Sequence, residues 1–508
     1  MSLSTAAPAS RPSSRNTVAL AAVCLSSLMF GLEISSVPVI LPALERQLHA
    51  GFGPLQWIMN AYTLACTTVL MAAGTFGDRY GRKRVFVLGL LAFAATSLAC
   101  GLATDARTLI VARFLQGGSG GVMLICGTAV LAHQFRAGRE RARAFAAWGV
   151  VFGIGLGFGP IVGGGILALA DWRWVFLVHV GLAAITLVPL WRGVEESRDP
   201  HAGRLDAAGI ATLSAGVFGL TWCLIQGPAA GFASATVLAV AAAALVALIA
   251  FVRIETAHAH PMFDFRVFRL RDFSGAMVGA VAMNISFWPF IVYLPIYFHG
   301  VLGYDAVAAG ALLLAYTLPT LVMPPLAERL SLRFHPGWTV SAGLFAIGAG
   351  FLAMRYGGRT ADPGWAQLLP GLLLAGTGLG MTNTPVTNTT TAAVPSERAG
   401  MATGMDMSAR FISLTVNIAA MGLILLAGIG THLRERYGAV VPAAAERIAA
   451  GDLNALGADA AARQAARAAL AHGFDLVMLY GGIGVWLLAA LGLAIFSPRR
   501  IAVRLADS

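Results

Sequence analysis

Fourteen apolar runs, each about 20 residues long, follow one another along this chain and constrain its fold more than any other feature. A helix needs about 20 apolar residues to cross the roughly 30 Å hydrocarbon core of a bilayer. In lipid, the backbone polar groups must be satisfied within each segment. The runs therefore predict an all-α polytopic membrane protein with 14 transmembrane helices. They lie at residues 18–42, 54–76, 85–104, 107–132, 142–169, 174–191, 206–226, 232–253, 273–298, 305–327, 337–355, 365–388, 399–427 and 475–496.

The composition agrees with a chain that lies mostly in lipid. Of its 508 residues, 57% are hydrophobic and 12% are charged, and the mean hydropathy is +0.75. A soluble nucleic-acid binder carries its basic residues on a folded surface, whereas here the net charge of +11 sits in short loops between apolar runs. We therefore expect no nucleic-acid partner. The five cysteines lie inside apolar runs and are predicted to be packing residues.

The distribution of arginine predicts the orientation. Basic residues are retained on the cytoplasmic side of a membrane, and arginines cluster after even-numbered runs, which places both termini in the cytoplasm. The clusters lie at residues 79–84, 136–143, 266–271, 329–333 and 499–504. The first run is too long for a cleaved signal peptide, so we expect an uncleaved first helix. The Ala-rich segment 431–473 is predicted to be an external loop with a short helix of its own.

Several enzyme classes are disfavoured by the residues present. A Walker A loop needs Gly-Lys followed by Ser or Thr, but the only lysine, Lys83, precedes Arg84. The run 117–121 matches Gly-x-Ser-x-Gly inside a membrane helix, where a nucleophile elbow does not form. His258 and His260 form a lone pair in a polar loop, which favours solvation over metal binding. We expect neither an enzyme nor a site for a metal or bound cofactor.

The loop between the second and third runs combines small and charged residues. Glycines permit close approach of helices and tight turns, and the loop carries an acid and several bases, which are expected to act in conformational gating. The residues are Gly74, Asp78, Arg79, Gly81 and Arg82. Asp78 is predicted to cap the next helix or to lock two bundles together. The segment 324–333 repeats the order of acid and base, and two related halves are what alternating access requires.

The fifth run carries two ridges of glycine. Gly149, Gly153 and Gly157 repeat every four residues, and so do the members of a second ridge. Ridges without side chains let another helix approach and slide, and a proline within them removes a backbone hydrogen bond and favours a kink. We predict a gating helix, with ordinary glycine packing as the alternative. The second ridge and the proline are Gly155, Gly159, Gly163 and Pro160.

Together these patterns resemble the major facilitator superfamily. The run from Arg113 to Gly117 resembles its fourth-helix motif, residues 155–164 resemble its antiporter signature, and Trp172 to Phe176 resembles a segment of fourteen-helix drug exporters. The resemblance to the fourteen-helix drug:proton antiporter family implies a major facilitator fold of two six-helix bundles plus two inserted helices. The expected parts are a tail 1–17, a bundle 18–191, a linker 192–205, inserted helices 206–253, a loop 254–272, a bundle 273–496 and a tail 497–508.

Ionisable side chains inside the predicted spans are candidates for proton coupling. Placing one at the middle of a membrane costs on the order of 3 kcal/mol, so such residues seldom lack a function. They are Glu33, Arg113, Asp406 and Arg410. Glu33 has a structural carboxylate as its alternative role, and Asp406 has that of a local counter-ion to Arg410. The resembled family usually has Asp at position 33 and Asn at position 179, where this chain has Glu and His.

A central cavity lined by aromatic and amide groups is expected to receive the substrate, because such groups combine stacking and cation–π attraction with a few polar contacts. Helix packing or interface anchoring is the alternative for the tyrosines. The candidates are Asn60, Tyr62, Gln116, Asn284, Trp288, Tyr293, Tyr297, Asn383, Asn388 and Asn417.

The combined prediction is a drug:proton antiporter of a bacterial inner membrane. It is expected to export hydrophobic or cationic small molecules by alternating access, driven by the proton motive force. The partners are the substrate, protons and the lipid bilayer, and the use of a periplasmic adaptor protein stays open. The alternatives are a dedicated exporter of one endogenous metabolite and a non-transporting membrane scaffold or sensor.

Overall fold

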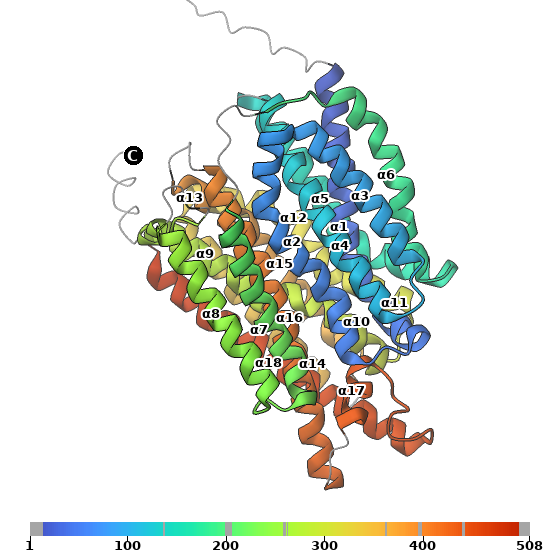
Figure 1. Cartoon of the computed structure of the whole chain (residues 1–508). Helices are drawn as coiled ribbons and strands as arrows, with labels where there is room; N and C mark the ends of the chain where they lie inside the picture. The colour runs from blue at the N-terminus through green and yellow to red at the C-terminus, as the bar shows by residue number, and fades with distance from the viewer. Residues whose placement is uncertain are drawn as a thin grey trace, which may run out of the picture.

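The computed structural model describes residues 14–135, 138–198, 206–257, 261, 263–360, 363–394, 399–438 and 442–496. Within these ranges the regular structure is entirely helical. Long helices run roughly alongside one another through the length of the molecule (Figure 1). Residues 1–13 of the predicted first tail, residues 199–205 of the predicted linker and the whole predicted tail 497–508 lie outside the described residues.

The first six helices pack among themselves, with α1 against α5 and α6, and α4 against α2 and α3. We call this group the first bundle. Its helices are α1 (Ser14–Leu48), α2 (Phe52–Tyr80), α3 (Arg82–Gly101), α4 (Ala106–Gln134), α5 (Gly138–Leu169) and α6 (Arg173–Gly193). The helix α1 continues through Pro38 and Pro42 without a break in its assignment.

Two helices, α7 (Ala207–Ala230) and α8 (Ala235–Ala257), pack on each other and run along one side of the molecule (Figure 1). Only 17% of the apolar stretch of α8 is buried. Its exposed side chains include Leu238, Leu245 and Ile249. A helix that exposes so much apolar surface is suited to contact with lipid tails. The helix α7 also touches α2 and α16.

The remaining helices form a second bundle in which α14, α15, α16 and α18 pack around α9. They are η1 (Phe265–Arg269), α9 (Arg271–Ile285), α10 (Phe287–Gly300), α11 (Ala306–Thr317), α12 (Pro319–Val322), α13 (Pro324–Arg333), α14 (Pro336–Gly358), α15 (Trp365–Ala392), α16 (Ala399–Tyr437), α17 (Pro442–Ala450) and α18 (Ala460–Ile495).

The membrane-spanning character of the chain is confirmed. In the described part of the chain, 12 helical segments are long and apolar enough to cross a membrane, counting α9 with α10 as one segment and α11 to α13 as another, and the bent α2 makes a thirteenth. The predicted span 365–388 corresponds to α15, a 28-residue helix that is not among them. Its second half is rich in Thr and Asn, which lowers its hydropathy. The number 14 itself stays a prediction.

Two predicted spans are not single helices. The span 273–298 divides into α9 and α10 at Ser286, and the span 305–327 divides into α11, α12 and α13. Proline cannot donate a backbone hydrogen bond and its ring clashes with the carbonyl four residues earlier. Pro289 lies four residues after Ile285, the last residue of α9, and Pro319 and Pro324 each begin a new helix. The sequence therefore interrupts these spans at its prolines.

The segment 431–473 contains the short helix α17, but α16 and α18 extend far into it from either side. The predicted span 475–496 thus starts 15 residues later than α18, which begins at Ala460. The helix α17 contacts α1 and α2 of the first bundle as well as α16 and α18. We refer to this end of the molecule, at the bottom of Figure 1, as the α17 end.

The glycines of α5 face either α1 within the first bundle or the seam, which is the interface between α1, α2 and α5 of the first bundle and α10, α11, α12 and α16 of the second. A side chain at Gly155 would meet the backbone of Leu28 at 2.6 Å, and one at Gly163 would meet the backbone of Ser36 at 2.8 Å. Gly157 instead faces the side chain of Leu321 in α12, and nothing lies within 4 Å of Gly149. One ridge therefore lets α5 approach α1 as closely as two backbones allow.

The contrast between two glycines of α5 gives a stability test. Gly155→Ala places a methyl group against the backbone of α1 and is expected to lower the free energy of unfolding by about 1–3 kcal/mol. Gly149→Ala meets open space and gains helix propensity, up to about 1 kcal/mol. Thermal unfolding of the two purified variants measures the difference. Equal effects of the two substitutions would contradict the packing described for α5.

Candidate coupling and substrate site

Glu33 of α1 and Arg113 of α4 form an ion pair whose side chains are both 0% exposed. Arg113 Nη1 also donates to Gln116 Oε1 at 2.8 Å, and Arg113 Nε donates to the carbonyl oxygen of Ile58 in α2 at 3.1 Å. Gln116 Nε2 donates onward to Ser97 Oγ of α3 at 2.9 Å. A guanidinium stays charged at any physiological pH, so this buried cation holds four helices of the first bundle around one carboxylate.

His179 of α6 is the third member of this charged group. Its Nδ1 lies 3.3 Å from Glu33 Oε2 and 3.0 Å from the carbonyl oxygen of Val175, and its Nε2 lies 3.2 Å from the carbonyl oxygen of Met29. Carbonyl oxygens only accept hydrogen bonds, and a neutral imidazole carries only one N–H. These contacts place the imidazole directly against the Glu33 carboxylate. We call Glu33, Arg113 and His179 the buried triad.

Several polar atoms in and beside the buried triad have no hydrogen-bond partner among the described residues. They are Glu33 Oε2, Arg113 Nη2 and the hydroxyl of Tyr62. The Arg113 guanidinium lies over the Tyr62 ring, 4.4 Å from its centroid. Buried polar atoms usually pair, and each exception calls for an explanation. The unpaired atoms belong to the buried triad or lie beside it. The triad contains a carboxylate and an imidazole, two groups that can exchange a proton.

A second charged cluster joins α15 and α16. Arg410 Nε donates to Asp406 Oδ1 at 2.9 Å, Arg410 Nη2 donates to Thr387 Oγ1 at 3.1 Å, and Arg410 Nη1 donates to Asn383 Oδ1. The Asp406 side chain is 0% exposed. The ion pair that the four-residue spacing predicts is thus present. Asn383, predicted as a cavity residue, is instead a partner of Arg410 in this cluster.

Aromatic rings occupy the seam between the two charged clusters. Phe30, one turn before Glu33, lies 6.0 Å from Tyr62, 6.2 Å from Phe152 and 6.4 Å from Phe411, measured between ring centroids. Phe411 directly follows Arg410 in α16. Trp148 stacks on Phe152 with an angle of 4° between the rings. We call these five side chains the seam aromatic cluster; it combines residues of both bundles.

Side-chain hydroxyls from both bundles bond the carbonyls of α5 on either side of Leu156. Pro160 cannot donate to the Leu156 carbonyl four residues earlier. Ser35 Oγ of α1 donates to the Gly155 carbonyl at 3.2 Å, and Thr317 Oγ1 of α11 donates to the Gly157 carbonyl at 2.7 Å. The helix α5 is assigned as continuous through Pro160. The helix α5 is therefore hydrogen-bonded to α1 of the first bundle and to α11 of the second bundle through carbonyls on either side of Leu156.

The charged loop after α2 is held by the segment that follows α6. Gly81 has a φ of 109°, which favours glycine, and a side chain there would meet the Glu196 carboxylate. Glu196 Oε1 accepts from the Lys83 backbone N–H at 3.2 Å. Asp78 bonds Arg82 at 2.9 Å, and the N-cap of α3 is Gly81, so the predicted capping role of Asp78 is wrong. Its predicted alternative, a lock between bundles, stays a prediction.

The other loop residues add little to this contact network. Arg79 lies over the Tyr80 ring at 5.6 Å, and Gly74 has Ile125 of α4 at 3.8 Å from an added side chain. In the repeated segment, Glu328 and Arg329 of α13 are exposed. The contacts that the structure gives for the charged loop lie within the first bundle.

Comparison with known proteins decides the family. The sequence model described as the Major Facilitator Superfamily matches residues 23–417. The chain belongs to the major facilitator superfamily. This membership makes the protein a multi-span membrane transporter of small molecules rather than an enzyme.

Individual relatives extend this finding. The chain is 30% identical over 428 residues to the multidrug resistance protein Stp of Mycobacterium tuberculosis, covering 84% of this chain and 79% of that protein. It is 30% identical to the tetracenomycin C resistance and export protein of Streptomyces glaucescens, covering 85% and 80%. The crystal structure of a bacterial homolog of the human lysosomal transporter Spinster, inward-facing and unoccupied, shares the fold with a TM-score of 0.66 at 14% identity, covering 96% and 99%.

The predicted cavity residues of this superfamily member take part in several different contacts. Gln116 belongs to the network of the buried triad, and Tyr62 belongs to the seam aromatic cluster. Asn60 is buried with no hydrogen-bond partner for its amide in the described chain. Asn284 bonds its own helix at Ala280, and Trp288 packs on Phe287.

The remaining candidates lie toward or beyond the edges of the seam. Tyr293 accepts from Gln56 of α2 across the seam and donates to the Ile418 carbonyl of α16 within the second bundle, and Tyr297 lines a separate pocket at the α17 end. Asn417 accepts from Tyr480, and Asn388 is exposed. Their roles in substrate binding stay predictions.

Sequence reasoning missed most of the aromatic residues at the seam. Phe30, Trp148, Phe152 and Phe411 carry no motif, and aromatic side chains are common in membrane helices. One signal of the site was present in the sequence. At position 179 this chain has His where the resembled family has Asn, and this His179 lies beside Glu33. In the described part of the chain, no three His, Cys, Asp or Glu side chains gather to hold a metal ion; the absence of a metal site stays a prediction.

Removing one member of the buried ion pair gives a second stability test. Arg113→Met leaves the Glu33 carboxylate buried without its main counter-ion and is expected to cost about 3–5 kcal/mol. The double variant Glu33→Gln with Arg113→Met is expected to cost less than the sum of the single variants, since it removes both charges. Thermal unfolding of the purified proteins measures the cycle.

The matched control is the partly exposed pair of Asp78 and Arg82, where Asp78→Asn is expected to cost at most about 1 kcal/mol. Additive effects of Glu33→Gln and Arg113→Met would show that the two buried charges do not depend on each other.

Proposed function

We propose that the protein is a proton-coupled exporter that moves hydrophobic or cationic compounds out of the cell by alternating access. The observation that carries the proposal is the buried triad, a carboxylate and an imidazole held beside a permanent cation in the core of the first bundle. Intramembrane ionisable groups mark proton and substrate pathways. The printed names of two relatives, a multidrug resistance protein and an antibiotic resistance and export protein, support export.

The seam aromatic cluster supports the substrate class. Its rings from α1, α2, α5 and α16 meet where the two bundles face each other. Aromatic faces bind flat apolar groups and attract cations. The charged clusters lie to either side of it, one around Glu33 and the other around Asp406. A bound organic cation would therefore be within the electrostatic influence of both carboxylates.

The proton exchange that we propose takes place at Glu33 and His179. When a proton binds Glu33, its carboxylate loses the charge that pairs with Arg113, and the four-helix network around that cation weakens. His179 holds the second titrating position of the triad, beside Glu33 Oε2. One proton moved down a potential of 100 mV supplies about 2.3 kcal/mol, which sustains a roughly 40-fold gradient of a neutral substrate.

The contacts across the seam support an inward-facing arrangement. The hydrogen bonds of Gln56 with Tyr293, and of Thr63 with Thr415, lie in the half of α2 nearer the α17 end. On α5, Pro160 faces Gly310 and Gly164 faces Ala306, again in the half nearer that end. We propose that the α17 end faces outward, with both termini in the cytoplasm and the protein in a bacterial inner membrane.

Replacing the carboxylate tests the proposed coupling. Cells that make the protein are expected to export the cationic dye ethidium, and a protonophore is expected to stop this efflux. Glu33→Gln keeps the shape of the side chain but removes its exchangeable proton, so efflux is expected to fall to the level of cells without the protein. Dye fluorescence measures both effects, and the exposed Glu435→Gln serves as the control.

The outcomes separate the alternatives. Efflux that persists with the protonophore would remove proton coupling. A normally folded wild-type protein that exports no member of a dye panel would favour a dedicated exporter of one metabolite.

Replacing His179 tests its place in the triad. Asn retains a hydrogen-bond donor but does not titrate, so His179→Asn is expected to flatten the pH dependence of efflux between about pH 5 and pH 8. A purely structural role would lower the rate at every pH by the same factor. The measurement is the initial rate of ethidium efflux in proteoliposomes across this range, with the partly buried His299→Asn as the control. An unchanged pH profile would exclude His179 from the proton site.

A further inference from the structure

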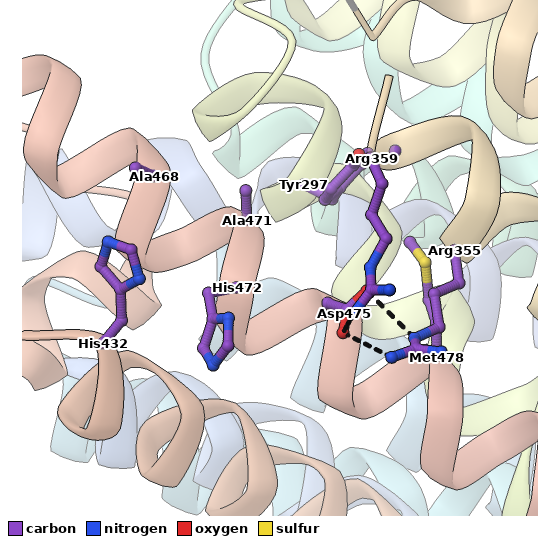
Figure 2. A pocket seen from close by; sticks show the side chains of 10 residues that line it. Tyr297, Arg355, Arg359, His432, Ala468, Ala471, His472, Asp475 and Met478 are labelled. Carbon is purple, nitrogen blue, oxygen red and sulfur yellow. Dashed lines mark hydrogen bonds and ion pairs between the residues drawn. The ribbon is translucent and has the colours of Figure 1, made fainter. Parts of the chain in front are cut away.

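A separate pocket of about 240 Å³ lies within the second bundle at the α17 end. It is lined by side chains from α10, α14, α16 and α18, and the seam aromatic cluster contributes none of them. Figure 2 shows Arg355 and Arg359 reaching toward Asp475, with His432 and His472 to one side. The proposed export mechanism uses none of these residues.

The pocket carries one uncompensated positive charge. Asp475 Oδ2 accepts from Arg355 Nη2 at 3.0 Å and from Arg359 Nη2 at 2.8 Å, and Asp475 Oδ1 accepts from Arg359 Nε at 2.5 Å. Two guanidiniums thus share one carboxylate, and the lining includes no other acidic residue. The side chains of Asp475 and Arg355 are 10% and 23% exposed, whereas that of Arg359 is 58% exposed, so water compensates part of the excess charge. One added negative charge would balance the pocket.

Donors without partners also face this pocket. Arg355 Nε is buried and lacks a hydrogen-bond partner in the described chain, although it lies 3.0 Å from Asp475 Oδ1. His432 Nε2 is likewise buried without a partner, and its ring lies 5.4 Å from that of His472. Arginine and histidine donors recognise carboxylates through short charge-assisted hydrogen bonds. The unpaired guanidinium nitrogen of Arg355, together with the excess positive charge, therefore points to an anion.

The size and walls of the pocket narrow the class of anion. Drug-sized ligands occupy pockets of about 300–1,000 Å³, so a pocket of about 240 Å³ suits a smaller molecule. The Tyr297 ring and the Met478 side chain add apolar and polarisable surface. A small organic acid fits this combination better than an inorganic dianion, because it brings one charge and an apolar body.

We propose that this pocket binds a small soluble organic monocarboxylate at the α17 end of the transporter. The carboxylate contacts Arg355 and Arg359 and competes with Asp475 for their donors, while the apolar body lies against Tyr297 and Met478. Bound there, the ligand connects α10, α14 and α16 near their ends with the middle of α18. The site is independent of the proposed proton coupling, and its test is a binding measurement.

Benzoate is the probe, titrated calorimetrically into the full-length protein in nanodiscs of uncharged phosphatidylcholine. Saturable binding is expected, and benzamide, which lacks the charge, is expected not to bind. Arg359→Gln is expected to weaken benzoate binding at least about tenfold, since it removes a charge-assisted contact. Arg434→Gln serves as the control. It also removes one positive charge, but from an exposed site at the α17 end of α16, and it is expected to leave binding unchanged.

Asp475→Asn gives a change of the opposite sign, which a purely structural ion pair would not produce. Because Asp475 competes with the ligand, its neutralisation is expected to tighten benzoate binding by about tenfold. Size-exclusion chromatography checks that each variant is folded. Absence of benzoate binding to the folded wild type, or equal binding of benzamide, would overturn the proposal.

Nanodiscs that contain phosphatidylglycerol distinguish a lipid phosphate from a soluble acid. Unchanged benzoate affinity in these discs supports a soluble ligand. The titrations are made at a salt concentration that screens the surface charge of the discs. Displacement of benzoate by the anionic lipid under these conditions, in the wild type and in Arg434→Gln alike, would assign the pocket to a lipid headgroup and would overturn the proposal.

Discussion

The ion pair between Glu33 and Arg113 is the interaction on which the first bundle depends. Both side chains are fully buried in a molecule whose exterior is apolar. A buried charge that loses its partner is far more costly than an exposed one. The four helices that contribute to the network of Arg113 are therefore held together by the same carboxylate at which we propose proton exchange. In this proposal, proton exchange and the packing of the bundle depend on the same atoms.

The glycines of α5 place a second constraint beside the first. Without side chains at Gly155 and Gly163, the backbone of α5 lies directly against that of α1, and α1 carries Glu33. Ser35, two residues after Glu33, bonds α5 across this contact. A change in the position of α1 is thus passed to α5 with little slack, because the contact is made by main chains rather than by long side chains.

Much of the architecture is readable from the sequence because lipid leaves few alternatives. Long apolar runs must become helices, and the run 232–253 does so as α8. The predicted spans include no break at Ser286 or Pro319, although both breaks are local effects of proline. The partners of buried polar residues are different. Asn383 bonds Arg410 and His179 contacts Glu33 only because distant helices meet, and no spacing within one helix encodes such a meeting.

The contacts of α5 with the second bundle change in kind along its length. Near the α17 end, Gly164 and Pro160 face the backbone of α11. Farther from that end, a side chain added at Gly153 or Gly157 would meet the end of the Leu321 side chain. A flexible side chain deforms readily, but two apposed backbones either touch or separate. The contact with Leu321 therefore permits small relative movements of the two bundles. The backbone contacts near the α17 end permit only close contact or full separation.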